Sequence, residues 1–140
     1  MNIDYHHTTQ TGDREINQDY CAQQITDQGA LFITADGLGG HQAGERISQV
    51  FCDNMLALAK DYKIKLQSAQ AKQTMQDWFK LAIDKMAKDY INDSAMQKAH
   101  TTCALLWLDN KQTITVHIGD VRIYRITDKQ LSRTRDHSVP

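Results

Sequence analysis

The sequence predicts an α+β fold in which helices pack against antiparallel sheets. Short strand-like runs occupy the beginning and the end of the 140-residue chain, and two segments with a helical period lie between them. Polar turns of a few residues separate neighbouring strand-like runs, so these strands are expected to pair as hairpins. Strands do not alternate steadily with helices, which argues against a parallel sheet. The length fits one domain, spanning 1–140.

The first strands precede the helices. One strand is expected to begin near Tyr20, and the apolar run 31–35 predicts a short buried strand that ends at Asp36-Gly37. Two helices follow, at 43–60 and 75–91, because large apolar side chains recur there on one helical face. These side chains are Ile47, Val50, Phe51, Met55 and Leu58 in the first helix, and Met75, Trp78, Phe79, Ala82, Ile83, Met86 and Tyr90 in the second. The polar stretch 61–72 between them is expected to be a connection, part of which can be helical.

The second half of the chain predicts two hairpins. Runs 102–108 and 113–118 flank a polar turn at 109–112, and runs 123–127 and 130–133 flank Asp128-Lys129. Both predicted helices need an apolar surface to cover, because neither is long or apolar enough to be stable alone.

Composition excludes several classes of protein. Hydrophobic residues make up 41% and charged residues 24%, with 16 basic and 17 acidic side chains and a net charge of -1. A nucleic-acid partner therefore has no basic surface to bind. No apolar run approaches the roughly twenty residues of a membrane span, and the first residues lack the pattern of a signal peptide. A cytoplasmic location is expected, with no membrane partner; the oligomeric state stays open.

The three cysteines are far apart in the sequence. Cys21, Cys52 and Cys103 are odd in number and contain no C-x-x-C pair, so they predict neither a disulfide framework nor a zinc site. Each lies among apolar neighbours, which favours small buried side chains over a catalytic thiol.

A glycine-rich segment is the first candidate for chemistry. Four of the seven glycines lie between Gly37 and Gly44, directly after the buried strand that carries Asp36. An acid at the end of a strand, beside glycines that let backbone carbonyls come close, suits hard cations such as Mg²⁺ and Mn²⁺. A phosphate loop would need a Gly-Lys-Ser/Thr that is absent. The alternative is a tight turn that needs positive backbone angles, with Asp36 as a helix cap.

Two weaker signals flank this segment. Arg14 lies five residues before Asp19 in a loop-like stretch; arginine suits a phosphoryl group because its planar fork binds two oxygens, although such a pair is more often a surface ion pair. Gly119-Asp120 forms a corner between two strand-like runs, and by itself it is most simply a turn.

The order of these motifs resembles the bacterial branch of the type 2C, metal-dependent protein phosphatases. Five motifs carry the resemblance along nearly the whole chain: R-x-x-N-Q-D at 14–19, A-D-G-L-G-G-H-x-A-G-E at 35–45, Thr101-Thr102, H-I-G-D-V-R-I-Y-R at 117–125, and T-R-D-H-S at 134–138. The resemblance implies a β-sandwich of two antiparallel sheets with helices outside. It also implies hydrolysis of phosphoserine and phosphothreonine in proteins, so the implied partner is a phosphorylated protein.

The resemblance also implies roles for individual residues. Asp36 would bridge two Mg²⁺ or Mn²⁺ ions, the Gly37 carbonyl and Asp19 would hold the second ion, and Asp120 would contribute to a third, weaker site. Arg14 would bind the substrate phosphate, and a water bridging the two main ions would attack phosphorus.

Two departures from the family pattern matter. Leu38 occupies the position where some relatives carry a histidine proposed as general acid; His41 is the nearest histidine, for which a structural role at the helix start is favoured. Family members continue well past Asp-His-Ser and bring two further aspartates for the first metal, with strands that complete both sheets. The chain is therefore expected to be a C-terminally truncated domain. Its alternative function is a catalytically impaired module that binds a phosphoprotein or regulatory partner; a sensor or scaffold without phosphate chemistry is disfavoured by the ligand motifs.

Overall fold

The computed structural model describes residues 2–40, 42–61 and 70–137. Their elements, in chain order, are β1 (Asp19–Ile25), β2 (Ala30–Leu38), α1 (Ala43–Asp61), α2 (Ala71–Asp89), α3 (Ser94–Lys98), β3 (His100–Thr101), β4 (Cys103–Leu108), β5 (Thr113–Ile118), β6 (Tyr124–Thr127) and β7 (Gln130–Arg133). The predicted α+β class is confirmed.

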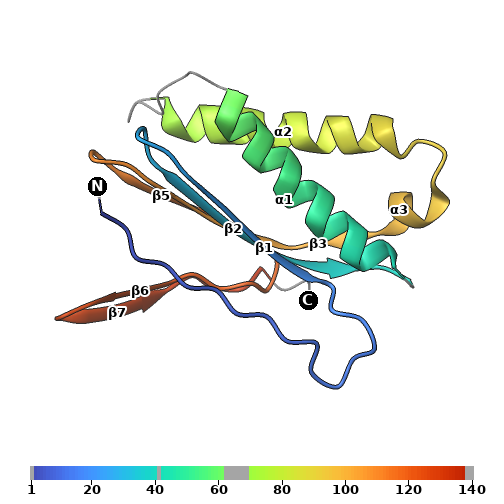
Figure 1. Ribbon diagram of the computed structural model, residues 1–140, viewed down its shortest axis with the longest axis horizontal. Coiled ribbons are helices and arrows are strands. Elements are labelled where there is room, and N and C mark those ends of the chain that lie inside the picture. The colour runs from blue at the N-terminus through green and yellow to red at the C-terminus, as the bar shows by residue number, and fades with distance from the viewer. Residues whose placement is uncertain (1, 41, 62–69, 138–140) are drawn as a thin grey trace.

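All strand pairs in the described chain are antiparallel. The main sheet has the order β1-β2-β4-β5, and β3 pairs with the end of β2. Strands β6 and β7 form a separate two-stranded hairpin. Helices α1 and α2 cover one face of the main sheet, whereas the hairpin and the N-terminal segment lie on the side of the other face (Figure 1). The molecule therefore has a helical layer, a central sheet and a hairpin beneath it.

The core lies between the main sheet and the helices. Alternate residues of β2 point into it, because Leu31, Ile33 and Ala35 are buried and Thr34 and Asp36 between and beyond them are exposed. The predicted stripes of α1 and α2 supply the opposing surface, and the rings of Trp78 on α2 and Trp107 on β4 meet edge to face. The core thus fixes which face of β2 is left for other functions.

The reactivity of the three cysteines follows from how deeply each is buried in this core. Cys52 and Cys103 are buried and Cys21 is half-buried, and all three are free thiols. Burial raises the pKa of the Cys103 thiol to about 12 and raises the pKa of the Cys52 thiol as well. Buried, protonated thiols are inert.

Some predicted boundaries were wrong. Strand β2 continues to Leu38 beyond the predicted end at residue 35, and α2 begins at Ala71 instead of the predicted residue 75. This start lies in the stretch 61–72, which was expected to be partly helical; residues 62–69 of that stretch lie outside the described part. The short elements α3 and β3 were not predicted. Helix α3 has five residues, too few for a visible period, and is identified by its cap: the Asp93 carboxylate accepts a hydrogen bond from the Met96 amide at 3.1 Å.

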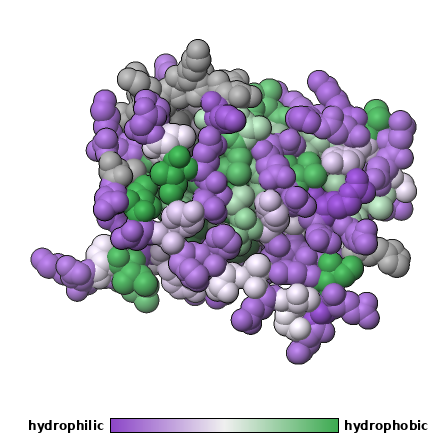
Figure 2. Space-filling view, viewed as in Figure 1, coloured by the Kyte–Doolittle hydropathy of each residue, from purple (hydrophilic) through white to green (hydrophobic). Residues whose placement is uncertain are grey.

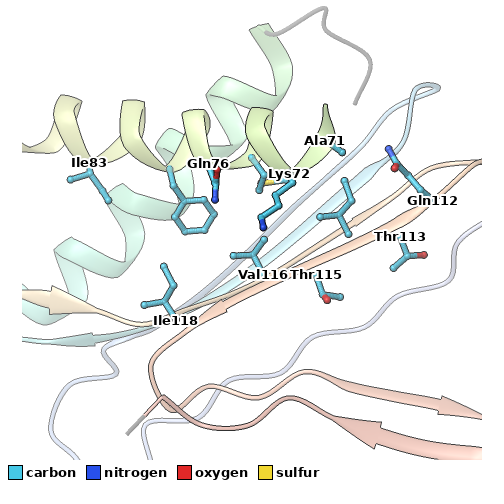
Figure 3. A pocket seen from close by; sticks show the side chains of 12 residues that line it. Ala71, Lys72, Gln76, Ile83, Gln112, Thr113, Thr115, Val116 and Ile118 are labelled. Atoms are coloured by element: carbon cyan, nitrogen blue, oxygen red, sulfur yellow. The ribbon is translucent and has the colours of Figure 1, made fainter. Parts of the chain in front are cut away.

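Ile83 lies on the apolar face predicted for α2, yet 55% of it is exposed. The cause is a groove of about 710 Å³ between α2 and the edge strand β5, which Ile83 lines together with Val116 and Ile118 (Figure 3). A helical period identifies an apolar face, but only packing determines how much of that face is covered.

The hairpin adds further exposed apolar surface. Tyr124, Ile126 and Leu131 are exposed, and hydrophobic patches over the hairpin stand out among hydrophilic side chains (Figure 2). Within the described residues, none of the helices has the length and apolar character needed to cross a bilayer.

Candidate metal centre

Asp19 and Asp36 face each other at one end of the main sheet. They are register partners in the antiparallel pair β1–β2. Directly opposite residues in such a pair have their Cα atoms about 4.5–5.5 Å apart. Because the buried residues of β2 alternate with Asp36, its carboxylate projects from the face opposite the helices. Strand pairing therefore brings together two carboxylates that are 17 positions apart in the sequence.

The electrostatics of Asp36 reflect this crowding. Partial desolvation raises the pKa of Asp36, and the charge of Asp19 and its side-chain hydrogen bonding raise it further. The charge of Asp120 acts in the same direction, whereas the guanidinium of Arg14 lowers the pKa of Asp36. The side chains of Asp19, Asp120 and Arg14 thus all act on the carboxyl group of Asp36. Concentrated negative charge of this kind is relieved by a cation.

The glycine-rich loop allows close approach of backbone segments. A Cβ atom on Gly37 would lie 1.9 Å from the Gly44 carbonyl oxygen and 3.0 Å from the Gln18 carbonyl oxygen. Positive φ angles among the described glycines occur at Gly12 and Gly119, outside this loop. The alternative of a turn with positive backbone angles was therefore wrong. The alternative of a helix cap was also wrong, because Asp36 lies inside β2.

Three polar side chains that sequence reasoning missed support this arrangement. The Ser48 hydroxyl is fully buried and donates to the Gln18 carbonyl at 2.7 Å, and the Gln18 side-chain amide donates to the Gly39 carbonyl at 3.1 Å. The Thr102 hydroxyl accepts the Asp36 amide hydrogen at 3.0 Å. The paired threonines were noted in the sequence without a role, and a serine on the apolar stripe of α1 was the available signal for Ser48.

The remaining predicted residues lie around this pair. Asp120 follows β5 at a bend where Gly119 has a φ of 93°. Arg14 is exposed in the loop before β1, and it forms no ion pair with Asp19 among the contacts of the described residues. The surface ion-pair alternative for Arg14 was therefore wrong. His41 lies outside the described residues.

The donor set fits a hydrated hard cation. Across the described ranges 2–40, 42–61 and 70–137, no three His, Cys, Asp or Glu side chains come close enough to hold one metal ion together. Mg²⁺ keeps several waters and takes only one or two carboxylates from a protein, and carboxylate, carbonyl and water oxygens also suit Mn²⁺. Asp19 and Asp36 are two paired carboxylates of this kind, and Gly37 follows Asp36 directly in β2. They do not form a dehydrated cage.

Comparisons with known proteins agree with the fold. The chain is 30% identical over 131 residues to protein phosphatase PhpP of Streptococcus pneumoniae, covering 90% of this chain and 51% of that protein. A crystal structure of a bacterial serine phosphatase superposes with a TM-score of 0.81 at 25% identity, covering 94% of this chain and 54% of the other. The catalytic domain of the serine/threonine protein phosphatase PstP, in complex with two manganese ions, gives 0.69 at 27% identity, covering 88% and 50%.

The chain thus spans about half the length of the relatives it matches. The family model for protein phosphatase 2C matches residues 8–138, nearly the whole chain. This span includes the loop of Arg14, the strand pair that carries Asp19 and Asp36, and the corner of Asp120. The chain therefore belongs to the protein phosphatase 2C family.

Proposed function

We propose that this chain forms part of the catalytic centre of a metal-dependent phosphatase that hydrolyses phosphoserine and phosphothreonine in proteins. The observation that carries this proposal is the pairing of Asp19 with Asp36 across β1 and β2, with the charges of Arg14 and Asp120 acting on the same carboxyl group. Family membership supports the reaction class, and the PstP structure with two manganese ions supports the choice of metal.

Asp36 is the proposed central ligand, shared between two Mg²⁺ or Mn²⁺ ions. Asp19 and the Gly37 carbonyl would hold the second ion, and Asp120 would contribute to a third, weaker site. Divalent cations in such a centre supply a water-derived nucleophile at neutral pH and offset the charge of the phosphoryl oxygens. The chain's own contribution is to hold the carboxylates on a rigid strand pair, with Thr102 hydrogen-bonded to the Asp36 backbone.

Arg14 is the proposed phosphate-binding residue. It is exposed, its charge reaches Asp36, and it lies on the loop next to Asp19. A guanidinium can donate two parallel hydrogen bonds to a phosphoryl group and orient it toward the carboxylates.

A second function is favoured by one observation. Arg14 is exposed and its charge acts on Asp36, so the described residues bring a phosphate-binding side chain and a carboxylate together whether or not turnover follows. The alternative is a phosphatase-like module that binds a phosphoprotein or regulatory partner without turnover.

The test combines calorimetric titration with Mn²⁺ and hydrolysis of p-nitrophenyl phosphate by the same purified chain. Asp36→Asn should weaken Mn²⁺ binding by tenfold or more, since even the loss of an outer-shell partner costs about that much. Asp84→Asn on the exposed side of α2 should bind Mn²⁺ as the unsubstituted chain does. Turnover that Asp36→Asn abolishes supports catalysis by the chain itself. Mn²⁺ binding with no turnover supports the binding module.

Arg14→Ala separates the phosphate role from the metal role. It should leave Mn²⁺ binding unchanged and weaken the binding of inorganic phosphate. A chain that binds neither Mn²⁺ nor phosphate at millimolar concentrations contradicts both functions.

A further inference from the structure

The corner that carries Asp120 is not part of any strand. It begins directly after β5 with Gly119 at a φ of 93°, and residues 119–123 have no ladder partner until β6 begins. Its position relative to the Asp19–Asp36 pair must therefore come from other contacts.

One side of the corner rests on Thr102. The Thr102 amide donates to the Asp36 carbonyl at 2.9 Å, and the Thr102 hydroxyl accepts the Asp36 amide hydrogen at 3.0 Å. A Cβ atom on Gly119 would lie only 2.7 Å from the Thr102 methyl carbon, so Thr102 packs directly against the corner. A single side chain thus separates the backbone of Asp36 from the backbone of Gly119.

The other side of the corner is held by the segment 134–137. The His137 amide donates to the Gly119 carbonyl at 2.9 Å, and the Thr134 amide donates to the Ile123 carbonyl at 3.0 Å. In return, the Ile123 amide donates to the Thr134 hydroxyl at 3.0 Å. Backbone contacts therefore bind this segment at both ends of the corner.

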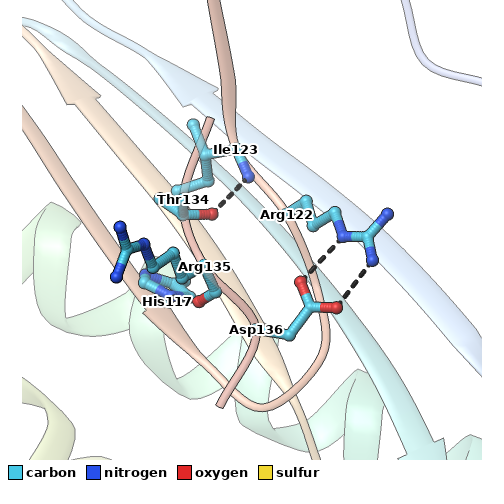
Figure 4. A network of polar contacts seen from close by, with 6 residues as sticks. All are labelled: His117, Arg122, Ile123, Thr134, Arg135 and Asp136. Atoms are coloured by element: carbon cyan, nitrogen blue, oxygen red, sulfur yellow. Dashed lines mark hydrogen bonds and ion pairs between the residues drawn. The ribbon is translucent and has the colours of Figure 1, made fainter. Parts of the chain in front are cut away.

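Arg122 and Asp136 join the same two segments through side chains. The Arg122 Nε and Nη2 atoms donate to the two carboxylate oxygens of Asp136 at 2.7 and 2.6 Å (Figure 4). Hydrogen bonding to Asp136 raises the pKa of Arg122, and hydrogen bonding from Arg122 lowers the pKa of Asp136. The fork is therefore charged on both sides throughout the physiological range.

His117 extends the contact to β5. Its Nε2 atom lies 2.8 Å from the Arg135 carbonyl oxygen, and its ring stacks on the ring of His137 with centroids 4.3 Å apart. The segment 134–137 is thus fastened to the end of β5, to the corner and to the start of β6.

We infer that the Arg122–Asp136 fork positions the Asp120 corner against Thr102 and so sets the place of the Asp120 carboxylate relative to Asp36. Arg122 and Asp136 are positioning residues in this arrangement, because neither is among the proposed ligands. The inference deepens the proposed function and rests on it for the part that concerns metal.

The exposure of the Arg122–Asp136 pair indicates whether the pair mainly fixes the geometry of the corner or mainly stabilises the fold. The Arg122 and Asp136 side chains remain 44% and 26% exposed, and ion pairs this open to solvent stabilise a fold weakly. A bidentate fork instead restricts geometry, because two parallel hydrogen bonds fix both planes. Loss of the fork should therefore change the corner far more than it changes unfolding.

The test uses nuclear magnetic resonance on the whole chain, with Arg122→Gln to break the fork and Arg125→Gln, an exposed arginine in β6, as the matched control. Without metal, backbone order parameters of Asp120 and Val121 should fall from the rigid value of about 0.85 to below about 0.6 in Arg122→Gln. They should stay unchanged in Arg125→Gln. Unchanged order parameters in Arg122→Gln overturn the inference, whatever the metal result.

The second measurement is the Mn²⁺-induced broadening of the amide signals of Asp36 and Asp120. In the unsubstituted chain, signals of Asp36 and Asp120 should broaden; in Arg122→Gln, broadening at Asp120 should need about tenfold more Mn²⁺, as loss of an outer-shell partner does. Equal titrations at Asp120 overturn the link to metal. No broadening at Asp36 in the unsubstituted chain contradicts the proposed metal centre instead, and the metal-free order parameters still decide whether the fork holds the corner.

Exchanging the charges of residues 122 and 136 tests whether a restored ion pair also restores the order of the corner. The double variant Arg122→Asp with Asp136→Arg should restore order at Asp120, and Arg122→Lys should restore it only in part, because an ammonium cannot form the fork.

Discussion

Gly37 determines how closely α1 approaches the strand pair of the candidate metal centre. A methyl group there would lie 1.9 Å from the Gly44 carbonyl oxygen and 2.6 Å from its carbon. Ordinary contact needs roughly 1.5 Å more, so Gly37→Ala must push the start of α1 away from β2. The backbone cannot rotate aside as a flexible side chain would.

Moving the start of α1 away from β2 would also break further contacts. The Ser48 hydroxyl on α1 donates to the Gln18 carbonyl at 2.7 Å, and the Gly37 amide donates to the same carbonyl at 3.0 Å. Overpacking costs about 1–3 kcal/mol, and each strained hydrogen bond costs about 1 kcal/mol. We expect Gly37→Ala to lower the free energy of unfolding by about 3 kcal/mol, or the melting temperature by about 12 °C for a chain of this length.

The assay is urea unfolding followed by tryptophan fluorescence, since Trp78 and Trp107 are both buried and in contact. Gly40→Ala is the matched control, because a Cβ at Gly40 meets no atom within 4 Å. It should change stability by less than about 0.5 kcal/mol. Equal midpoints for the two variants would refute the reasoning that close backbone approach, and not loop composition, requires glycine at 37.

Four further predictions concern charge, metal binding, packing and thiol reactivity. Because desolvation and the charge of Asp19 raise the pKa of Asp36, Asp36→Asn without metal should stabilise the chain at pH 7 by less than about 1 kcal/mol after solvent screening. This gain should vanish as the pH falls below the usual range of aspartate. Mn²⁺ at a hundredfold excess over its Kd should add about 2.7 kcal/mol to the unsubstituted chain and to Asp84→Asn but not to Asp36→Asn; thermal melts that show the same order with and without Mn²⁺ contradict this. Leu105→Ala, at a side chain 1% exposed, should cost about 2–5 kcal/mol in urea unfolding, and a cost under 1 kcal/mol would mean that the sheet–helix core is not closed. Ellman's reagent at pH 8 should label half-buried Cys21 quickly and Cys103, whose pKa burial raises to about 12, only after unfolding; rapid labelling of all three thiols would show that the core is open.

Much of the fold was predictable because its signals are local. The stripes of α1 and α2 and the strand β5 were found from spacing alone, since a helix or a strand repeats its buried positions at a fixed period. Helix α3 and strand β3 were missed because five and two residues cannot display a period. The exposure of Ile83 was not predictable, because it depends on a groove beside β5 rather than on its position in the helix.

For the candidate site, the sequence by itself determined the residue types: carboxylates at 19, 36 and 120, an arginine at 14, and glycines between 37 and 44. The tertiary structure decided that Asp19 stands opposite Asp36, because register is a property of two paired strands and not of either one. It also decided that Gly37 is required by contact with Gly44, and that Thr102, Arg122 and Asp136 hold the Asp120 corner. Such contacts join residues far apart in the chain, and only packing in three dimensions can specify them.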